Sequence, residues 1–319
     1  MSETINAAQV TSWGSPPTYT ALPAPPSPLP ESGVVQIRVL ATGVHQLVRS
    51  RAAGKHYTSG PLPHVLGVDG VGTTIPEGKL VYFITLRTGG GSFAEVVNVP
   101  KSYVFDLPDG AKPEMVAAMV NPAMSSWMAL KTRVDLTQLP KEGWTALIVG
   151  ATSASGVIAA ATARKLGATR VIGVARNATK LAAVPNIDVQ VIIGDPVTST
   201  DFSQLGEVDV ILDYLYGPLV AHLLSTLPRQ RRPLQYVQIG TVTGPDMALP
   251  GAALRSKNLT IRGAGPGAWG FDELNNELPE MLSFVVQAPP PKLRVEKLKD
   301  IEKAWGVMEN DGERLVFTP

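Results

Sequence analysis

Hydrophobic and polar residues follow two different patterns along the chain. Up to about residue 120, short apolar runs are separated by Gly and Pro, which is typical of a β-rich domain. The clearest runs predict strands at residues 34–41, 80–85 and 94–99, and a helical pattern follows at 113–119. The first part of the chain is therefore expected to be β-rich.

From residue 144 onward, buried-type apolar runs alternate with helical segments. The pattern predicts strands at residues 146–149, 171–175, 189–193, 208–212, 234–239 and 259–261. Strands joined by helix-length connections predict βαβ units and hence an α/β fold with a doubly wound parallel sheet. After a Pro-rich break at 288–292, a helix at 301–308 and a strand at 315–317 are expected.

Composition argues against several classes of binding partner and excludes cysteine-based sites. The 319 residues carry a net charge of +1, so no broad field favours nucleic acid or an anionic membrane. No apolar stretch approaches the roughly 18 residues of a membrane span, and no signal peptide is evident, so a cytoplasmic protein with a small-molecule partner is expected. The absence of cysteine excludes disulfides, thiolate nucleophiles and Cys-based metal sites.

The sharpest local pattern is a strand, a turn of small residues and a helix at residues 147–168. Ala151, Ser153 and Gly156 stand where the dinucleotide-binding pattern G-x-G-x-x-G has its glycines, with Ala154 and Ser155 between them. This arrangement points backbone N–H groups and a helix N-terminus at a pyrophosphate. An ordinary tight turn is the alternative interpretation.

A cation follows the second predicted strand of this region. Arg176 ends that strand and Lys180 lies one helical turn later, where NAD-binding proteins carry an acidic residue for the ribose hydroxyl. Cations suit a 2′-phosphate, so the pattern favours NADPH over NADH. Two solvated surface cations are the alternative.

Together these segments resemble the medium-chain dehydrogenase/reductase superfamily in its zinc-free, quinone-oxidoreductase-like branch. The resemblance is carried by VVQIRVLATGV, LPHVLGVDGVG, GGGSFAEVVNVPKSYVFDLPDG, VNPAMSSWMAL and VQIGTVTG, in this order. It implies a GroES-like catalytic domain at 1–119 completed by 287–319, a Rossmann NADPH-binding domain at 120–286, and a homodimer that pairs near residues 259–262.

The resemblance also implies cofactor contacts outside the phosphate loop. These are Asn121 and Ser125 in the helix between the domains, Gly240 and Thr241 after the fifth Rossmann strand, and Gly265 to Trp269 in a later loop. Asp213 follows the fourth strand and is either structural or a cofactor contact.

No metal is expected. Zinc-dependent relatives have a Cys at the position of His45 and Gly-His-Glu at the position of Gly67-Val68-Asp69. His45 and Asp69, with His56 or His64 as a third, could in principle be ligands, but the loss of the central His argues against the three-ligand tetrahedral frame of a catalytic zinc.

Hydride transfer without zinc requires an intrinsically reactive acceptor, so a quinone or an α,β-unsaturated carbonyl is the expected substrate. The resemblance places Tyr57 at the mouth of a cleft as the leading hydrogen-bond or proton donor, with His56 and His45 as further candidates. Alternatives are a ketone reductase, an enoyl-thioester reductase and a non-catalytic NADPH-binding protein.

Overall fold

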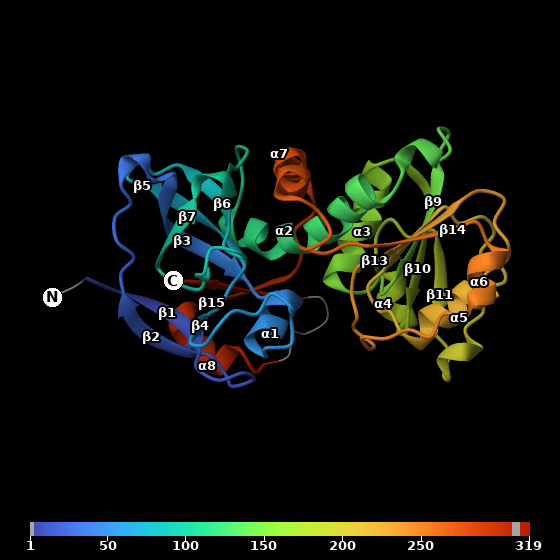
Figure 1. Ribbon diagram of the computed structural model, residues 1–319, viewed down its shortest axis with the longest axis horizontal. Coiled ribbons are helices and arrows are strands. Elements are labelled where there is room, and N and C mark those ends of the chain that lie inside the picture. Colours follow the sequence, from blue (N-terminus) through green and yellow to red (C-terminus); the bar gives the residue numbers. More distant parts are fainter. Residues whose placement is uncertain (1–2, 308–312) are drawn as a thin grey trace. The chain divides into compact units, whose positions relative to one another are not determined.

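The chain divides into two compact units. The computed structural model describes residues 3–307 and 313–319 (Figure 1). Unit 1 consists of Met1–Asn121 with Leu278–Pro319, and unit 2 is Pro122–Glu277. Both boundaries lie within helices, α2 (Pro113–Met128) and α7 (Phe271–Gln287), which contain Pro122 and Pro279.

Unit 1 is built mainly from β-strands. Its strands are β1 (Thr4–Val10), β2 (Thr18–Pro23), β3 (Val34–Gly43), β4 (His64–Val65), β5 (Asp69–Ile75), β6 (Leu80–Ile84), β7 (Val96–Pro100), β8 (Val104–Asp106), β15 (Leu293–Lys297) and β16 (Arg314–Thr318). One sheet has the order β2-β1-β4, and the other has the order β15-β16-β3-β5-β6-β8 with β7 also paired to β3. The short helices α1 (Gln46–Ala52) and α8 (Ile301–Ala304) complete the unit.

The alternating pattern of β3 explains its place in the core of unit 1. Ile37, Val39 and Ala41 are buried, whereas Arg38 is exposed. Alternate side chains of a strand point to opposite faces of the sheet, so β3 turns its apolar face inward. β16 pairs with the end of β3. This pairing joins the last strand of the chain to the part of unit 1 formed by residues 1–121.

Unit 2 contains one parallel sheet of order β11-β10-β9-β12-β13-β14, the order of a Rossmann fold (Figure 1). Its strands are β9 (Trp144–Val149), β10 (Ala168–Ala175), β11 (Val189–Ile192), β12 (Val210–Asp213), β13 (Leu234–Gln238) and β14 (Leu259–Gly263). The helices are α3 (Ala154–Lys165), α4 (Ala178–Ala182), α5 (Pro218–Thr226) and α6 (Gly251–Ser256). All six residues of β9 are buried, because this central strand has a hydrophobic cluster on each face.

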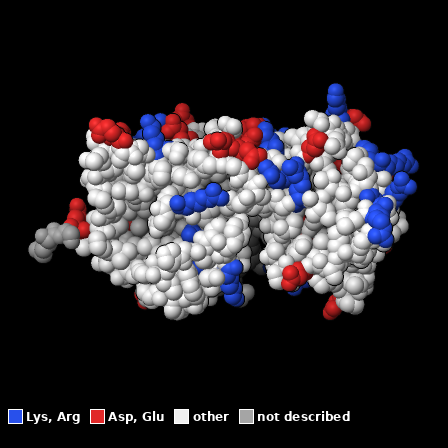
Figure 2. Space-filling view, viewed as in Figure 1, with Lys and Arg blue, Asp and Glu red and all other residues white. Residues whose placement is uncertain are grey.

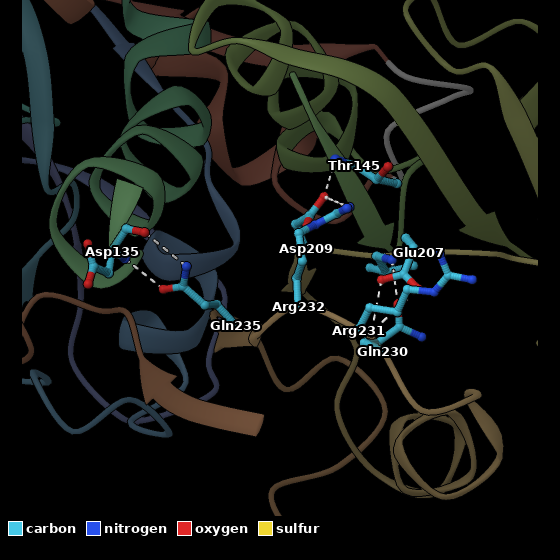
Figure 3. Close-up of polar contacts among 9 residues, drawn as sticks. Asp135, Thr145, Glu207, Asp209, Gln230, Arg231, Arg232 and Gln235 are labelled. Atoms are coloured by element: carbon cyan, nitrogen blue, oxygen red, sulfur yellow. Dashed lines mark hydrogen bonds and ion pairs between the residues drawn. The ribbon is translucent and has the colours of Figure 1, made fainter. Parts of the chain in front are cut away.

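The amino ends of the unit 2 strands are fixed by buried side chains (Figure 3). Asp209 accepts a hydrogen bond from the Thr145 amide (2.8 Å) and another from Nε of Arg232 (2.6 Å). Gln235 exchanges two hydrogen bonds with the backbone of Asp135. These bonds fix the edge of the sheet at the amino ends of the strands. Ligands of open parallel sheets bind at the opposite edge, outside the carboxyl ends.

The surface shown in Figure 2 carries acidic and basic side chains with wide uncharged areas between them. Within the described part of the chain, no helix is long and apolar enough to cross a membrane.

The predicted fold class is confirmed, although several element ends differ. The helical pattern predicted at 113–119 extends to Met128. The helix predicted at 301–308 ends at Ala304 in the structure, shortly before Gly306, a residue type that disfavours helix. Met308 lies outside the described residues.

Candidate active site

The turn after β9 is held by backbone bonds and by one serine. The amides of Gly150 and Ala151 both donate to the carbonyl oxygen of Val174 on the neighbouring strand. Ser153 caps α3: its hydroxyl accepts from the Gly156 amide (3.0 Å) and donates to the Gly150 carbonyl (2.8 Å). The serine at the second glycine position is therefore part of the turn itself.

Two glycines of this turn explain how it forms without the full glycine pattern. Gly150 has φ +95°, a conformation that side chains rarely adopt, so the tight turn falls one residue before Ala151. A Cβ on Gly156 would collide with the Gly150 carbonyl oxygen, so the first turn of α3 lies directly against the strand end. The sequence comparison with G-x-G-x-x-G missed the role of Gly150, because this glycine lies outside the pattern.

The N-terminus of α3 is available to an anion. The first amides of a helix have no carbonyl partner within it, and they coincide with the positive end of its dipole. Ala154 and Ser155 are partly exposed, and Ser153 is exposed. The residues present therefore fit a dinucleotide pyrophosphate.

Arg176 directly follows β10, the neighbour of β9 in the sheet. Its side chain is exposed, and Lys180 is exposed on the short helix α4. Asn177 occupies the cap of α4, where its side chain accepts from the Lys180 amide. The end of β10 thus carries a cation and an amide, and no carboxylate.

The other expected cofactor residues of unit 2 are distributed along the same edge of the sheet. Gly240 and Thr241 follow β13, and Gly265 and Trp269 follow β14. Parallel strands end at one edge, so these loops share that edge with the turn at Gly150. Ser125, in α2, is within hydrogen-bond distance of the Tyr214 hydroxyl (3.2 Å), and Tyr214 follows β12. Asn121 is the last residue of the first segment of unit 1.

Asp213 is buried and hydrogen-bonded within unit 2. Its carboxylate is fully buried and accepts from the amides of Leu215 and Tyr216 and from the hydroxyl of Tyr236. Burial raises the pKa of Asp213, and these three hydrogen bonds oppose the shift. The side chain holds the loop after β12 in place.

In unit 1, Tyr57 and His56 are neighbours on the loop after α1. Tyr57 is 71% exposed, and its ring lies 4.2 Å from that of His56, centroid to centroid. Nδ1 of His56 accepts from the Thr58 amide, so the neutral ring carries its proton on Nε2. Burial, and secondly the Arg51 charge, lower the pKa of His56.

His45 is buried in a polar network that the sequence did not reveal. Its Nδ1 lies 2.8 Å from Nη2 of Arg314, and because arginine only donates, Nδ1 must accept. Nε2 lies 3.3 Å from Oδ1 of Asp69, but the two atoms are not aligned as a hydrogen bond. The other oxygen of Asp69 accepts from the hydroxyl of Tyr82 (2.8 Å). Both ring nitrogens of His45 therefore face groups inside unit 1.

Of this network, only His45 stands at a position where the resemblance places a zinc ligand of zinc-dependent relatives. Within residues 3–307 and 313–319, the structure contains no group of three or more His, Asp or Glu side chains placed to hold a metal ion. At His45, the nitrogen that faces Arg314 is directed at a positive charge.

Replacing His45 should destabilise unit 1. In His45→Ala, the buried guanidinium of Arg314 would lose a hydrogen-bond acceptor, so we expect the free energy of unfolding to fall by about 3 kcal/mol. Denaturant unfolding measures this loss. The matched control is the exposed neighbour Gln46→Ala, for which a change below about 0.5 kcal/mol is expected. If the two variants had equal free energies of unfolding, His45 would not stabilise unit 1.

Comparisons with known proteins agree with this geometry. No protein-family model matches the chain. A protein of Emericella nidulans named "Probable NADPH-dependent quinone reductase tdiC" is 35% identical over 364 aligned positions, which cover 99% of this chain and 100% of the relative.

Solved structures with under 25% identity support the fold. A mycobacterial quinone oxidoreductase matches with a TM-score of 0.80 and 20% identity, covering 99% of this chain and 100% of that one. The quinone oxidoreductase of Pseudomonas syringae matches with a TM-score of 0.77 and 19% identity, with the same coverage. Mycobacterial Rv1454c complexed with NADPH matches with a TM-score of 0.78 and 20% identity, again with that coverage.

The relative in Emericella nidulans spans the whole chain at an identity that establishes common descent, and the solved structures share both units of the fold. The resemblance inferred from the sequence is confirmed: the chain belongs to the quinone-reductase branch of the medium-chain dehydrogenase/reductase superfamily.

Proposed function

We propose that this chain is an NADPH-dependent reductase of quinones. The observation that carries the proposal is the pairing of an anion-binding helix N-terminus after β9 with Arg176 at the end of β10. The name of the 35% identical relative, an NADPH-dependent quinone reductase, agrees with both the cofactor and the substrate class expected from the sequence.

The cofactor would be held chiefly by backbone groups and two cations. The turn at Ala151 and the start of α3, from Ser153 through Ala154 and Ser155 to Gly156, would bind the pyrophosphate. Arg176 and Lys180 would face the 2′-phosphate. Further contacts are proposed for Asn121, Ser125, Gly240, Thr241, Gly265 and Trp269. Bound NADPH supplies the hydride.

The chain's own contribution to the chemistry is a hydrogen-bond donor for the oxygen that becomes negative. Tyr57 is proposed for this role, because its ring is exposed and is supported by the ring of His56. The lowered pKa of His56 keeps its imidazole neutral at pH 7, so Nε2–H can donate a hydrogen bond without carrying a charge. His45, whose Nδ1 accepts from Arg314 and whose Nε2 faces Asp69, is proposed to support the fold of the site.

We propose that the reaction needs no zinc. The support is the replacement of the zinc-binding Cys and His of relatives by His45 and Val68, and the engagement of His45 by Arg314. A quinone is suited to such a site, since its reduced oxygen is stabilised by delocalisation into the ring.

NADPH consumption in the presence of a chelator tests the proposed function. We expect turnover with an ortho-quinone and less with an α,β-enone or an aryl ketone. Reduction of the ketone alone would favour the carbonyl-reductase alternative. No consumption with any acceptor, by protein that binds NADPH, would contradict the proposal and favour a non-catalytic role. Loss of turnover on chelation, with stoichiometric zinc, would contradict zinc independence.

Arg176→Ala should weaken NADPH binding by about 10- to 100-fold, because a charged hydrogen bond to the 2′-phosphate is lost. NADH binding should change less than about threefold. Equilibrium titration of both cofactors measures the two effects, and Arg229→Ala, an exposed cation before β13, is the control. Equal losses for both cofactors would remove Arg176 from the phosphate site.

Tyr57→Phe should lower kcat by about 100-fold, as is typical when a proton or hydrogen-bond donor is removed. Because Tyr57 is exposed, the fold should be unaffected. Tyr19→Phe, a partly buried tyrosine of β2, controls for the loss of a hydroxyl. An unchanged kcat would reduce Tyr57 to a residue that lines the site.

We further propose a cytoplasmic homodimer. The support for the dimer is β14, which pairs only with β13 in the unit 2 sheet and exposes 41% of Ile261. A free strand edge is a ready template for pairing with a second copy. Light scattering should give twice the chain mass for the wild type and a monomer for Ile261→Lys. A monomeric wild type would overturn the dimer.

A further inference from the structure

A buried arginine in unit 1 has no acidic partner. Arg51, in α1, is 5% exposed. Its Nε donates to the carbonyl oxygen of Thr58 (3.2 Å) and its Nη1 to that of Gly67 (3.4 Å). Among the described residues Arg51 forms no ion pair with a carboxylate, and its Nη2, which forms no hydrogen bond there, is not among the fully buried nitrogens and so keeps some access to solvent.

Two carbonyl groups compensate only part of this charge. A buried ion without a counter-ion is costly, and carbonyl oxygens carry only partial charge. Arginine cannot lose its proton in a protein, so it cannot escape this cost by neutralisation. The guanidinium therefore retains both a charge and donors suited to an anionic oxygen.

The imidazoles near Arg51 do not supply the missing negative charge. His64 is 8% exposed, and its Nε2 has no hydrogen-bond partner in the described part of the chain. Burial, and secondly the charge of Arg51, lower the pKa of His64 to about 4. His56 is bound to Thr58, the same residue whose carbonyl binds Arg51. The cluster is thus one cation beside two neutral rings.

We propose that Arg51 binds an anionic oxygen of the substrate, and that the preferred acceptors are quinones with an ionised ring hydroxyl. The position of the cation supports this assignment, because Thr58 connects Arg51 to His56 and thereby to the proposed donor Tyr57. The quinone ring in this inference rests on the proposed function, whereas the anion preference rests on Arg51.

The test compares two ligands that share one ring system. 2-Hydroxy-1,4-naphthoquinone is an anion at neutral pH, and its 2-methoxy analogue is uncharged. Calorimetric titration of the full-length protein with each, without NADPH, measures binding independently of turnover. We expect the wild type to bind the anion at least about tenfold more tightly than the methoxy analogue.

Arg51→Gln should weaken binding of the anion by about 10- to 100-fold and change binding of the methoxy analogue less than about threefold. Arg51→Lys keeps the charge and should lose less. Lys55→Gln removes an exposed cation from the same loop and should leave the preference unchanged.

Equal losses for both ligands in Arg51→Gln would show that Arg51 only fixes the loop through Thr58 and Gly67, and would overturn the proposal. If Arg51→Gln does not fold, the wild type decides: equal affinity for the two ligands contradicts an anion site. Anion binding that depends on Arg51, in protein that reduces no acceptor, would support the anion site and refute the proposed function.

Discussion

The close contact between the start of α3 and the end of β9 is the constraint on which the proposed cofactor site depends. Gly156 packs against the Gly150 carbonyl so tightly that no side chain fits between them. This contact aims the helix N-terminus at the carboxyl edge of the sheet, and Ser153 fixes the turn by bonding to both glycines. Arg176, Gly240 and the loop at Gly265 reach the same edge because the strands that precede them are parallel to β9.

Unit 1 contains two sets of buried charged side chains that are stabilised in different ways. Around His45, the charges of Asp69 and Arg314 belong to one network in which Tyr82 also donates a hydrogen bond. Arg51, by contrast, is held only by backbone carbonyls among the described residues. A cation that has an imidazole acceptor and a nearby carboxylate inside the unit fits a structural role, whereas a cation held by carbonyl groups alone fits a role in binding. The difference separates the two sites although both are buried in the same unit.

Much of the fold followed from the sequence, because strand periodicity and glycine breaks are local signals. Each of the six strands of unit 2 overlaps a predicted strand, and the strand–turn–helix at residues 147–168 forms as expected. The pattern did not include Gly150, which has the positive φ of this turn and lies one residue before the first pattern position, Ala151.

The site in unit 1 was harder to predict, because its contacts join residues far apart in the sequence. Nothing local links His45 to Arg314, which approaches only because β16 pairs with β3. The same holds for the bond from Arg51 to the carbonyl of Gly67 and for the burial of both cations. Hydrophobic patterns predicted β3, β6 and β16 but not β5, which carries Asp69, and the polar partners depended on tertiary packing.

We propose that the edge of the unit 2 sheet selects NADPH by its 2′-phosphate. The most direct measurement is the Kd of the wild-type protein for NADPH and for NADH, by calorimetry in one buffer. We expect NADPH to bind at least about tenfold more tightly, which is the ratio expected for one charge-assisted hydrogen bond. Equal affinities, or tighter binding of NADH, would contradict it.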